Sequence, residues 1–218
     1  LQQRNMVVAY VWMPGKTYET SSNHGIPGHV ALQVGTEYCS FWPARNKKGG
    51  RENLGVIRPS AADFKKISYE SDAEGMEYEA DDAVELEGLN EKSVLREWKN
   101  IKGRSIKYQL LNVNCCTVST KLLQTGFINT SWGQDFMESH AGPNLRQVMD
   151  SASTDVTDVM FLTPTSVLFF TYLIKNASED WVYTERQVRD LVKQKFDEAH
   201  PLQQERGWLG AWLEGLFG

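Results

Sequence analysis

Apolar residues in the first part of the chain follow the patterns of β-strands. Residues 6–13 are β-branched and aromatic and end at Pro14, which predicts a buried strand and then a turn. Residues 29–43 alternate around Gly35, a glycine that suits the first position of a two-residue type II′ turn. In that register one face of the hairpin is apolar, and the other combines a histidine with polar and aromatic residues: His29, Ala31, Gln33, Tyr38, Ser40 and Trp42. The second face is typical of an active-site wall.

Apolar residues later in the chain recur at helical spacing. They predict helices that begin after the caps Asn90, Asn114 and Thr163, and a further amphipathic helix over residues 185–199. We expect the helix after Asn114 to end at Gly126, because glycine adopts the left-handed conformation without steric cost.

Three further segments carry weaker patterns. Residues 84–86 predict a short strand, and residues 135–140 with 144–149 predict a loop and a short helix. Residues 60–82 are poorly patterned and acidic, which favours a solvated, mobile loop over a calcium site.

These elements predict an α+β fold in which a small antiparallel sheet packs against helices. Residues 1–200 would form a single domain, and residues 201–218 an apolar, tryptophan-rich tail. We expect this tail to dock on the domain. The alternative is that residues 207–218 contact a membrane surface or a partner.

Composition narrows the classes of protein to consider. A chain of 218 residues with 41% hydrophobic content can bury a core, and its net charge of −5 argues against a nucleic-acid binder. The three cysteines, of which two are adjacent, form no disulfide framework. The sequence shows neither an apolar run long enough to span a bilayer nor a secretory signal. We therefore expect a monomer that is made in the cytoplasm.

The candidate chemistry centres on Cys115 in the first turn of the helix that follows Asn114. Unpaired N–H groups and the helix dipole can lower the pKa of a cysteine there to roughly 3.5–7.5, which produces a nucleophile. The hairpin histidine, His29, would serve as its base. If the base instead followed the cysteine in the chain, His140 and Asn144 would complete the set, and Cys116 is the rival thiol to Cys115.

The alternative to a catalytic cysteine–histidine pair is a zinc site made by His24, His29, Cys115 and Cys116. Adjacent cysteines and a four-residue histidine gap outside a helix fit no usual zinc spacing. We expect neither a metal nor a cofactor.

Three motifs together resemble those of a known family: residues 28–32 around His29, residues 38–43, and residues 108–115 leading to Asn114 and Cys115. They are similar to the circularly permuted papain-like cysteine peptidases of the NlpC-like superfamily, a set that also includes lecithin:retinol acyltransferase-like enzymes and permuted deubiquitinase-like peptidases. The resemblance covers roughly residues 28–126.

The resemblance implies a permuted papain-like fold and a role for each motif. Cys115 matches the nucleophile and His29 the base, while Ser40 or Gln33 stands where the third catalytic residue is expected. Asn114 would help with orientation or the oxyanion, and Trp42 and His24 would contact substrate. The second strand lacks the family's histidine or asparagine orienter.

Three functions follow as hypotheses. The first is a cysteine hydrolase that cleaves an amide bond in a peptidoglycan stem peptide or a protein, as a bacterial toxin or effector exported by a dedicated secretion system. The second is an acyltransferase or lipid hydrolase, and the third is a non-catalytic binding module with the same fold.

Overall fold

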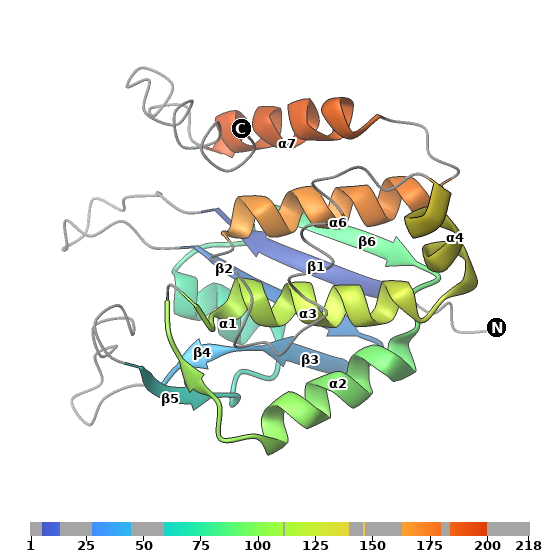
Figure 1. Ribbon diagram of the computed structural model, residues 1–218. Helices are drawn as coiled ribbons and strands as arrows, with labels where there is room; N and C mark the ends of the chain where they lie inside the picture. The colour runs from blue at the N-terminus through green and yellow to red at the C-terminus, as the bar shows by residue number, and fades with distance from the viewer. Residues whose placement is uncertain are drawn as a thin grey trace.

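The computed structural model is an α+β protein in which helices pack against a small antiparallel sheet (Figure 1). It describes residues 6–13, 28–44, 59–110, 112–139, 146, 163–179 and 184–199. Four strands form the main sheet in the order β3-β2-β1-β6, and every neighbouring pair is antiparallel. The strands are β1 (Met6–Trp12), β2 (His29–Val34), β3 (Glu37–Ser40) and β6 (Asp82–Glu87).

The β2–β3 hairpin has the register expected from the sequence. Val34 pairs with Glu37 and Ala31 with Ser40 across a two-residue turn. Gly35 has a φ of +56°, and the only non-glycine residue with positive φ among the described residues is Glu77. Because a type II′ turn needs positive φ at its first central position alone, this turn fits that type.

Six helices complete the described part of the fold. The short strand predicted at residues 84–86 and the four helices predicted after Asn90, Asn114 and Thr163 and over residues 185–199 are all present. The helices are α1 (Tyr69–Met76), α2 (Glu91–Gly103), α3 (Cys115–Ile128), α4 (Ser131–Ser139), α6 (Pro164–Ser178) and α7 (Glu185–Ala199).

The two faces of the main sheet are covered by different helices. In Figure 1, α3 and α6 lie in front of the sheet and α1 lies behind it. The front layer contains the larger core, which includes Val30, Leu32 and Cys39. The rear cluster contains Trp12, Ala31, Tyr38, Trp42 and Met76. The hairpin therefore has the predicted apolar face and the predicted mixed face.

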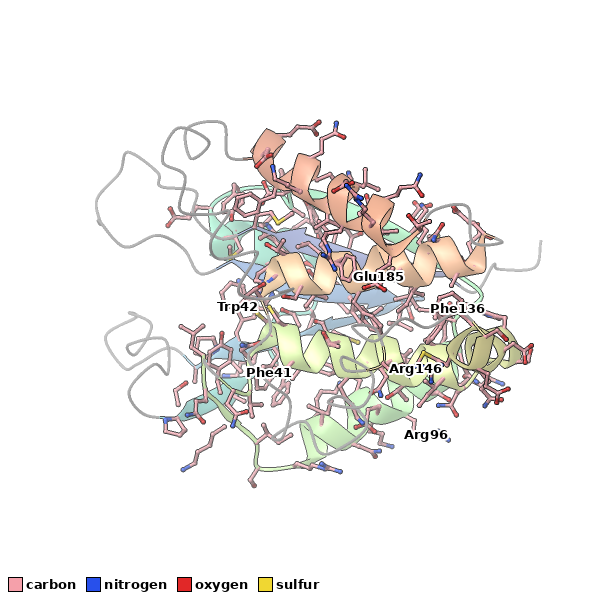
Figure 2. All side chains as sticks on the ribbon, turned by 45° about the horizontal axis from the view of Figure 1, so that its top comes forward. Phe41, Trp42, Arg96, Phe136, Arg146 and Glu185 are labelled. Atoms are coloured by element: carbon pink, nitrogen blue, oxygen red, sulfur yellow. The ribbon has the colours of Figure 1, made fainter. Side chains whose placement is uncertain are left out.

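A second, three-stranded sheet connects the hairpin to α3. Its order is β4-β5-β7, formed by β4 (Trp42–Pro43), β5 (Ser60–Asp63) and β7 (Lys107–Tyr108). Phe41 belongs to the front core and its neighbour Trp42 to the rear cluster (both labelled in Figure 2). The chain thus changes sheets between β3 and β4, and β7 then leads directly into the turn before α3.

The prediction that α3 ends at Gly126 is wrong, because the helix continues to Ile128. The glycine instead allows α2 and α3 to approach closely. A Cβ atom at position 126 would lie 2.6 Å from Cγ2 of Val94, which is fully buried on α2. Gly126 is therefore a packing residue rather than a cap.

Two predicted loops are also wrong. Residues 60–82 contain β5 and α1. Ser68 caps α1, because its side chain accepts a hydrogen bond from the backbone N–H of Ser71. Residues 135–139 belong to α4 rather than to a loop. The predicted short helix over 144–149 and the tail over 201–218 lie outside the described residues, apart from Arg146. No helix in the described ranges is long and apolar enough to cross a membrane.

Candidate active site

Cys115 is the first residue of α3, and Asn114 caps that helix. The Asn114 Oδ1 atom accepts hydrogen bonds from the backbone N–H groups of Cys116 at 2.8 Å and Thr117 at 3.0 Å. The Thr117 hydroxyl in turn accepts a bond from the Asn114 backbone N–H at 2.9 Å, which completes a capping box. Asn114 Nδ2 donates to the carbonyl of Leu110 at 2.7 Å, so the turn and the helix start are held as one unit.

The start of β2 is joined to α3 through the peptide groups of Val30. Pairing between β2 and β3 extends only to Ala31 and Ser40, so β2 continues past the end of its neighbour. The Val30 N–H donates a hydrogen bond to the Cys115 sulfur. The Val30 carbonyl accepts a hydrogen bond from the Ser119 hydroxyl, one turn along α3, at 3.4 Å. These two contacts fix the sulfur against the strand that carries His29.

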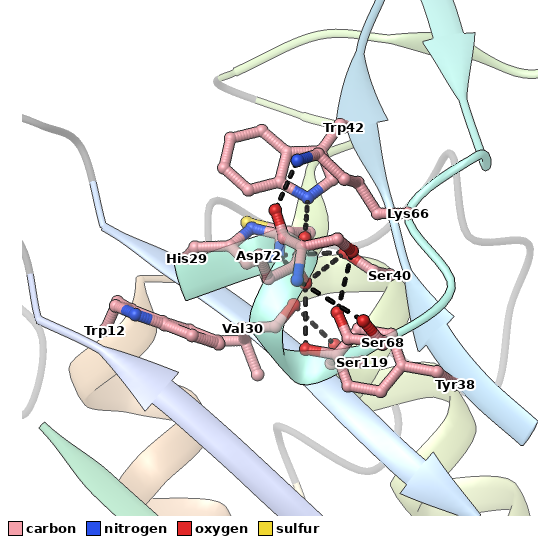
Figure 3. Close-up of polar contacts among 12 residues, drawn as sticks. Trp12, His29, Val30, Tyr38, Ser40, Trp42, Lys66, Ser68, Asp72 and Ser119 are labelled. Atoms are coloured by element: carbon pink, nitrogen blue, oxygen red, sulfur yellow. Dashed lines mark hydrogen bonds and ion pairs between the residues drawn. The ribbon is translucent and has the colours of Figure 1, made fainter. Parts of the chain in front are cut away.

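His29 joins the sulfur to a buried carboxylate. Its Nε2 atom lies 3.1 Å from Asp72 Oδ2 and 3.0 Å from Ser40 Oγ (Figure 3). The imidazole also forms a hydrogen bond with the Cys115 side chain. Because Nε2 is engaged by Asp72 and Ser40, Nδ1 is the ring nitrogen left to face the sulfur. Asp72 comes from α1 behind the sheet and Cys115 from α3 in front, and His29 at the start of β2 links them past the end of β3 (Figure 1).

Asp72 is surrounded by hydrogen-bond donors and is fully buried, with 0% of its surface exposed. Its Oδ2 atom accepts from the Ser40 hydroxyl at 2.6 Å and the Tyr38 hydroxyl at 2.9 Å, in addition to His29. Its Oδ1 atom accepts from Trp42 Nε1 at 2.6 Å. Figure 3 shows this arrangement with Asp72 at its centre. Although burial opposes ionisation, the hydrogen bonds lower the pKa of Asp72, and it is an anion.

The hydrogen bonds and charges favour an ion pair between sulfur and imidazole. The thiol of Cys116 and the positive charge of His29 lower the pKa of Cys115 well below its ordinary value, although burial acts in the opposite direction. Burial also disfavours a charged His29, but the Cys115 thiolate and the hydrogen bond to Asp72 outweigh it and raise the pKa of His29 to about 9. Both shifts favour a thiolate and an imidazolium over the neutral pair.

Two tryptophan rings flank the imidazole. The centroid of the Trp42 ring lies 4.2 Å from that of His29, and the centroid of the Trp12 ring lies 5.5 Å from it. A cation over the face of an indole ring is stabilised by the ring quadrupole, and the effect increases when water is excluded. Since His29 has only 2% of its surface exposed, both rings support the imidazolium.

The structure brings together four of the residues selected from the sequence. Cys115, His29, Ser40 and Trp42 lie in one connected group, and Asn114 caps the helix beside it. Trp42, expected to contact substrate, is 6% exposed and donates to Asp72. The Asn114 carboxamide is likewise engaged in the turn and cap, with Nδ2 donating to the Leu110 carbonyl and Oδ1 accepting from the Cys116 N–H.

Gln33 is not brought to this group, in contrast to the expectation for it. It lies at the far end of β2, where its Nε2 donates to the carbonyls of Gly35 at 2.8 Å and Glu37 at 3.1 Å. Hydrogen bonding within its own turn explains its position. His24, His140 and Asn144 lie outside the described residues.

Asp72 is the site residue that the sequence reading missed. It falls within an acidic stretch, and its charge suggested solvent exposure. A helical signal was nevertheless present, because Ser68 is a suitable cap and Tyr69, Ala73 and Met76 have helical spacing. Asp72 lies on the same face of α1 as these residues, and that face is directed at the hairpin.

The arrangement does not resemble a metal centre. Among the residues that the structure describes, no group of three or more histidine, cysteine, aspartate and glutamate side chains could hold a metal ion. Cys115 and His29 instead contact each other.

Comparison with known proteins gives no relative from which a function could be transferred. No protein-family model matches the chain. The search of curated proteins and the search of solved structures likewise give no match. The function must therefore be inferred from the site itself.

Proposed function

We propose that this protein is a cysteine hydrolase that cleaves an amide bond through a covalent acyl-enzyme. Cys115 would be the nucleophile, His29 the general acid and base, and Asp72 the residue that orients His29. Ser40 would share the orienting role, because its hydroxyl lies within hydrogen-bond distance of both partners.

One observation carries the proposal: a buried imidazole that is hydrogen-bonded to a cysteine on one side and to a carboxylate on the other. An inert core cysteine needs neither partner. A carboxylate that accepts the Nε2 proton fixes the tautomer and directs Nδ1 at the sulfur, as the orienting residue of a nucleophile–base–carboxylate set does.

The chemistry follows from these contacts. The Cys115 thiolate attacks the amide carbonyl, forming a carbon–sulfur bond and a tetrahedral oxyanion. His29 then donates its Nδ1 proton to the amine as the carbon–nitrogen bond breaks, which leaves a thioester. Neutral His29 next takes a proton from water, and the resulting hydroxide equivalent attacks the thioester. The acid leaves, and the thiolate–imidazolium pair is restored.

The backbone N–H of Cys115 is the best candidate to hold the oxyanion. The Asn114 side chain satisfies the N–H groups of Cys116 and Thr117. Among the described residues the N–H of Cys115 meets no acceptor, and it belongs to the nucleophile itself. Such unpaired donors at a helix start suit developing negative charge.

For the substrate and the fold family, the support is the resemblance of the motifs to permuted papain-like peptidases. The histidine strand precedes the cysteine helix, as it does in that set. A peptidoglycan stem peptide or a protein amide is therefore the proposed substrate, and export as a toxin or effector the proposed context.

The test is digestion of purified peptidoglycan and of a mixed peptide library, with products identified by mass spectrometry. Wild-type protein and Cys39→Ala should release the same new amine and carboxylate ends. Cys39 is the matched control, because it is also a buried free cysteine but lies on β3 outside the site. Cys115→Ala should release none, and products that persist in this variant would overturn the proposal.

A further inference from the structure

The second cysteine of the pair, Cys116, makes and breaks no bond in the reaction described above. Its side chain is 3% exposed, and its sulfur lies 4.0 Å from the Cys115 sulfur, within the range of a hydrogen bond between sulfur atoms. Side chains of adjacent helical residues normally diverge, so this contact is a specific feature of the first turn of α3.

The contacts around the two sulfurs decide which of them donates the hydrogen bond. Cys115 also accepts hydrogen bonds from the Val30 N–H and from His29, so negative charge is stabilised there by two groups from β2. Burial and the neighbouring Cys115 charge raise the pKa of Cys116 well above its ordinary value, and it therefore keeps its proton. Cys116 is the donor and Cys115 the acceptor.

The cap residue holds Cys116 in position. The backbone N–H of Cys116 donates to Asn114 Oδ1 at 2.8 Å, which fixes the peptide that links the two cysteines. The backbone of Cys116 is thereby held by the same hydrogen bonds that begin the helix, and its sulfur lies 4.0 Å from that of Cys115.

We propose that Cys116 is a positioning residue whose thiol donates its proton in a hydrogen bond to the Cys115 sulfur and so stabilises the nucleophilic thiolate. This inference rests on the proposed function, because it assumes that Cys115 is the nucleophile. No bond is broken in this role, and Cys116 remains a thiol throughout.

The test compares donor and donor-free side chains at position 116. Cys116→Ser keeps a hydroxyl donor, whereas Cys116→Ala and Cys116→Val have none, and valine also fills the space of the thiol. Ionisation of Cys115 would be followed by ultraviolet thiolate absorbance against pH in reduced protein, with the Cys115→Ala signal subtracted. The titratable groups that bear on this sulfur are Cys116 on its own helix and His29 on β2, which is paired with Asp72 of α1.

We expect the apparent pKa of Cys115 to rise in both donor-free variants and to stay near the wild-type value in Cys116→Ser. A hydrogen bond to a charged group corresponds to a rise of roughly one to two pH units, or a ten- to hundredfold lower ratio of thiolate to thiol. If Cys116→Ala does not fold, Cys116→Val gives the same comparison.

The outcomes separate this inference from the function on which it rests. If wild-type Cys115 ionises at low pH and the donor-free variants ionise at the same pH, Cys116 has no such role, although the proposed nucleophile stands. An equal rise in Cys116→Ser and in the donor-free variants would also overturn the inference, since it would mark a packing effect. If wild-type Cys115 ionises like an ordinary thiol, the proposed function itself fails.

Discussion

Replacing Asp72 with asparagine tests whether a buried carboxylate organises the site. The substitution keeps the size of the side chain but removes its charge. Asp72 is fully buried and accepts hydrogen bonds from His29, Tyr38, Ser40 and Trp42. Asparagine has one acceptor oxygen, and its amide group would present N–H bonds to neighbours that are themselves donors.

The expected cost is large because the site excludes water. Removing one partner of a buried charged pair costs about 3–5 kcal/mol, since the other charge is left uncompensated. That is a substantial part of the roughly 5–15 kcal/mol that stabilises a typical domain. The hydrogen bond to Asp72 also helps to raise the pKa of His29, so its loss lowers that pKa and weakens the ion pair with Cys115.

Urea unfolding of wild-type protein and Asp72→Asn measures the first effect, and alkylation of Cys115 near neutral pH measures the second. Glu74→Gln is the matched control, because Glu74 lies on the same helix but is exposed, and it should change stability by less than about 0.5 kcal/mol. If Asp72→Asn unfolded like the control and labelled at the wild-type rate, Asp72 would have neither role.

Two further predictions concern packing and protonation. Gly126→Ala should destabilise the protein by about 1–3 kcal/mol in urea unfolding, because its Cβ would lie 2.6 Å from Val94 Cγ2. Gly103→Ala, where a Cβ meets nothing within 4 Å, should not destabilise it, and equal losses in both would contradict close packing. In histidine NMR, His29 should lose its proton as the pH rises through about 9. This midpoint should fall in Cys115→Ala, because the thiolate is the strongest influence raising it, and an unchanged midpoint would exclude the ion pair.

The sequence was informative where one local rule decided the outcome. Alternation around Gly35 gave the hairpin register, and with it the shared face of His29, Ser40 and Trp42. Asn114 marked the helix start that contains Cys115. Both features depend on residues close together in the chain, so pattern and propensity were sufficient.

The sequence was less informative where distant segments meet. The role of Asp72 depends on α1 packing behind the β2–β3 hairpin. Asp72 lies 32 positions after Ser40, the hairpin residue to which it is hydrogen-bonded. Its charge alone suggested a solvent-exposed position. Gly126 has the sequence context of a helix end, and its packing role depends on the close approach of Val94 from α2. Local propensity carries no information on such approaches.

The most direct test of the thiolate–imidazolium pair is the pH dependence of iodoacetamide labelling at each cysteine, resolved by mass spectrometry. Cys115 should react well below its ordinary pKa of 9.0, while Cys39 and Cys116, whose pKa values are raised, stay unlabelled. His29→Ala should shift the labelling of Cys115 to higher pH. Labelling of Cys115 that begins only near pH 9 in the wild-type protein, with no effect of His29→Ala, would contradict an activated nucleophile at this site.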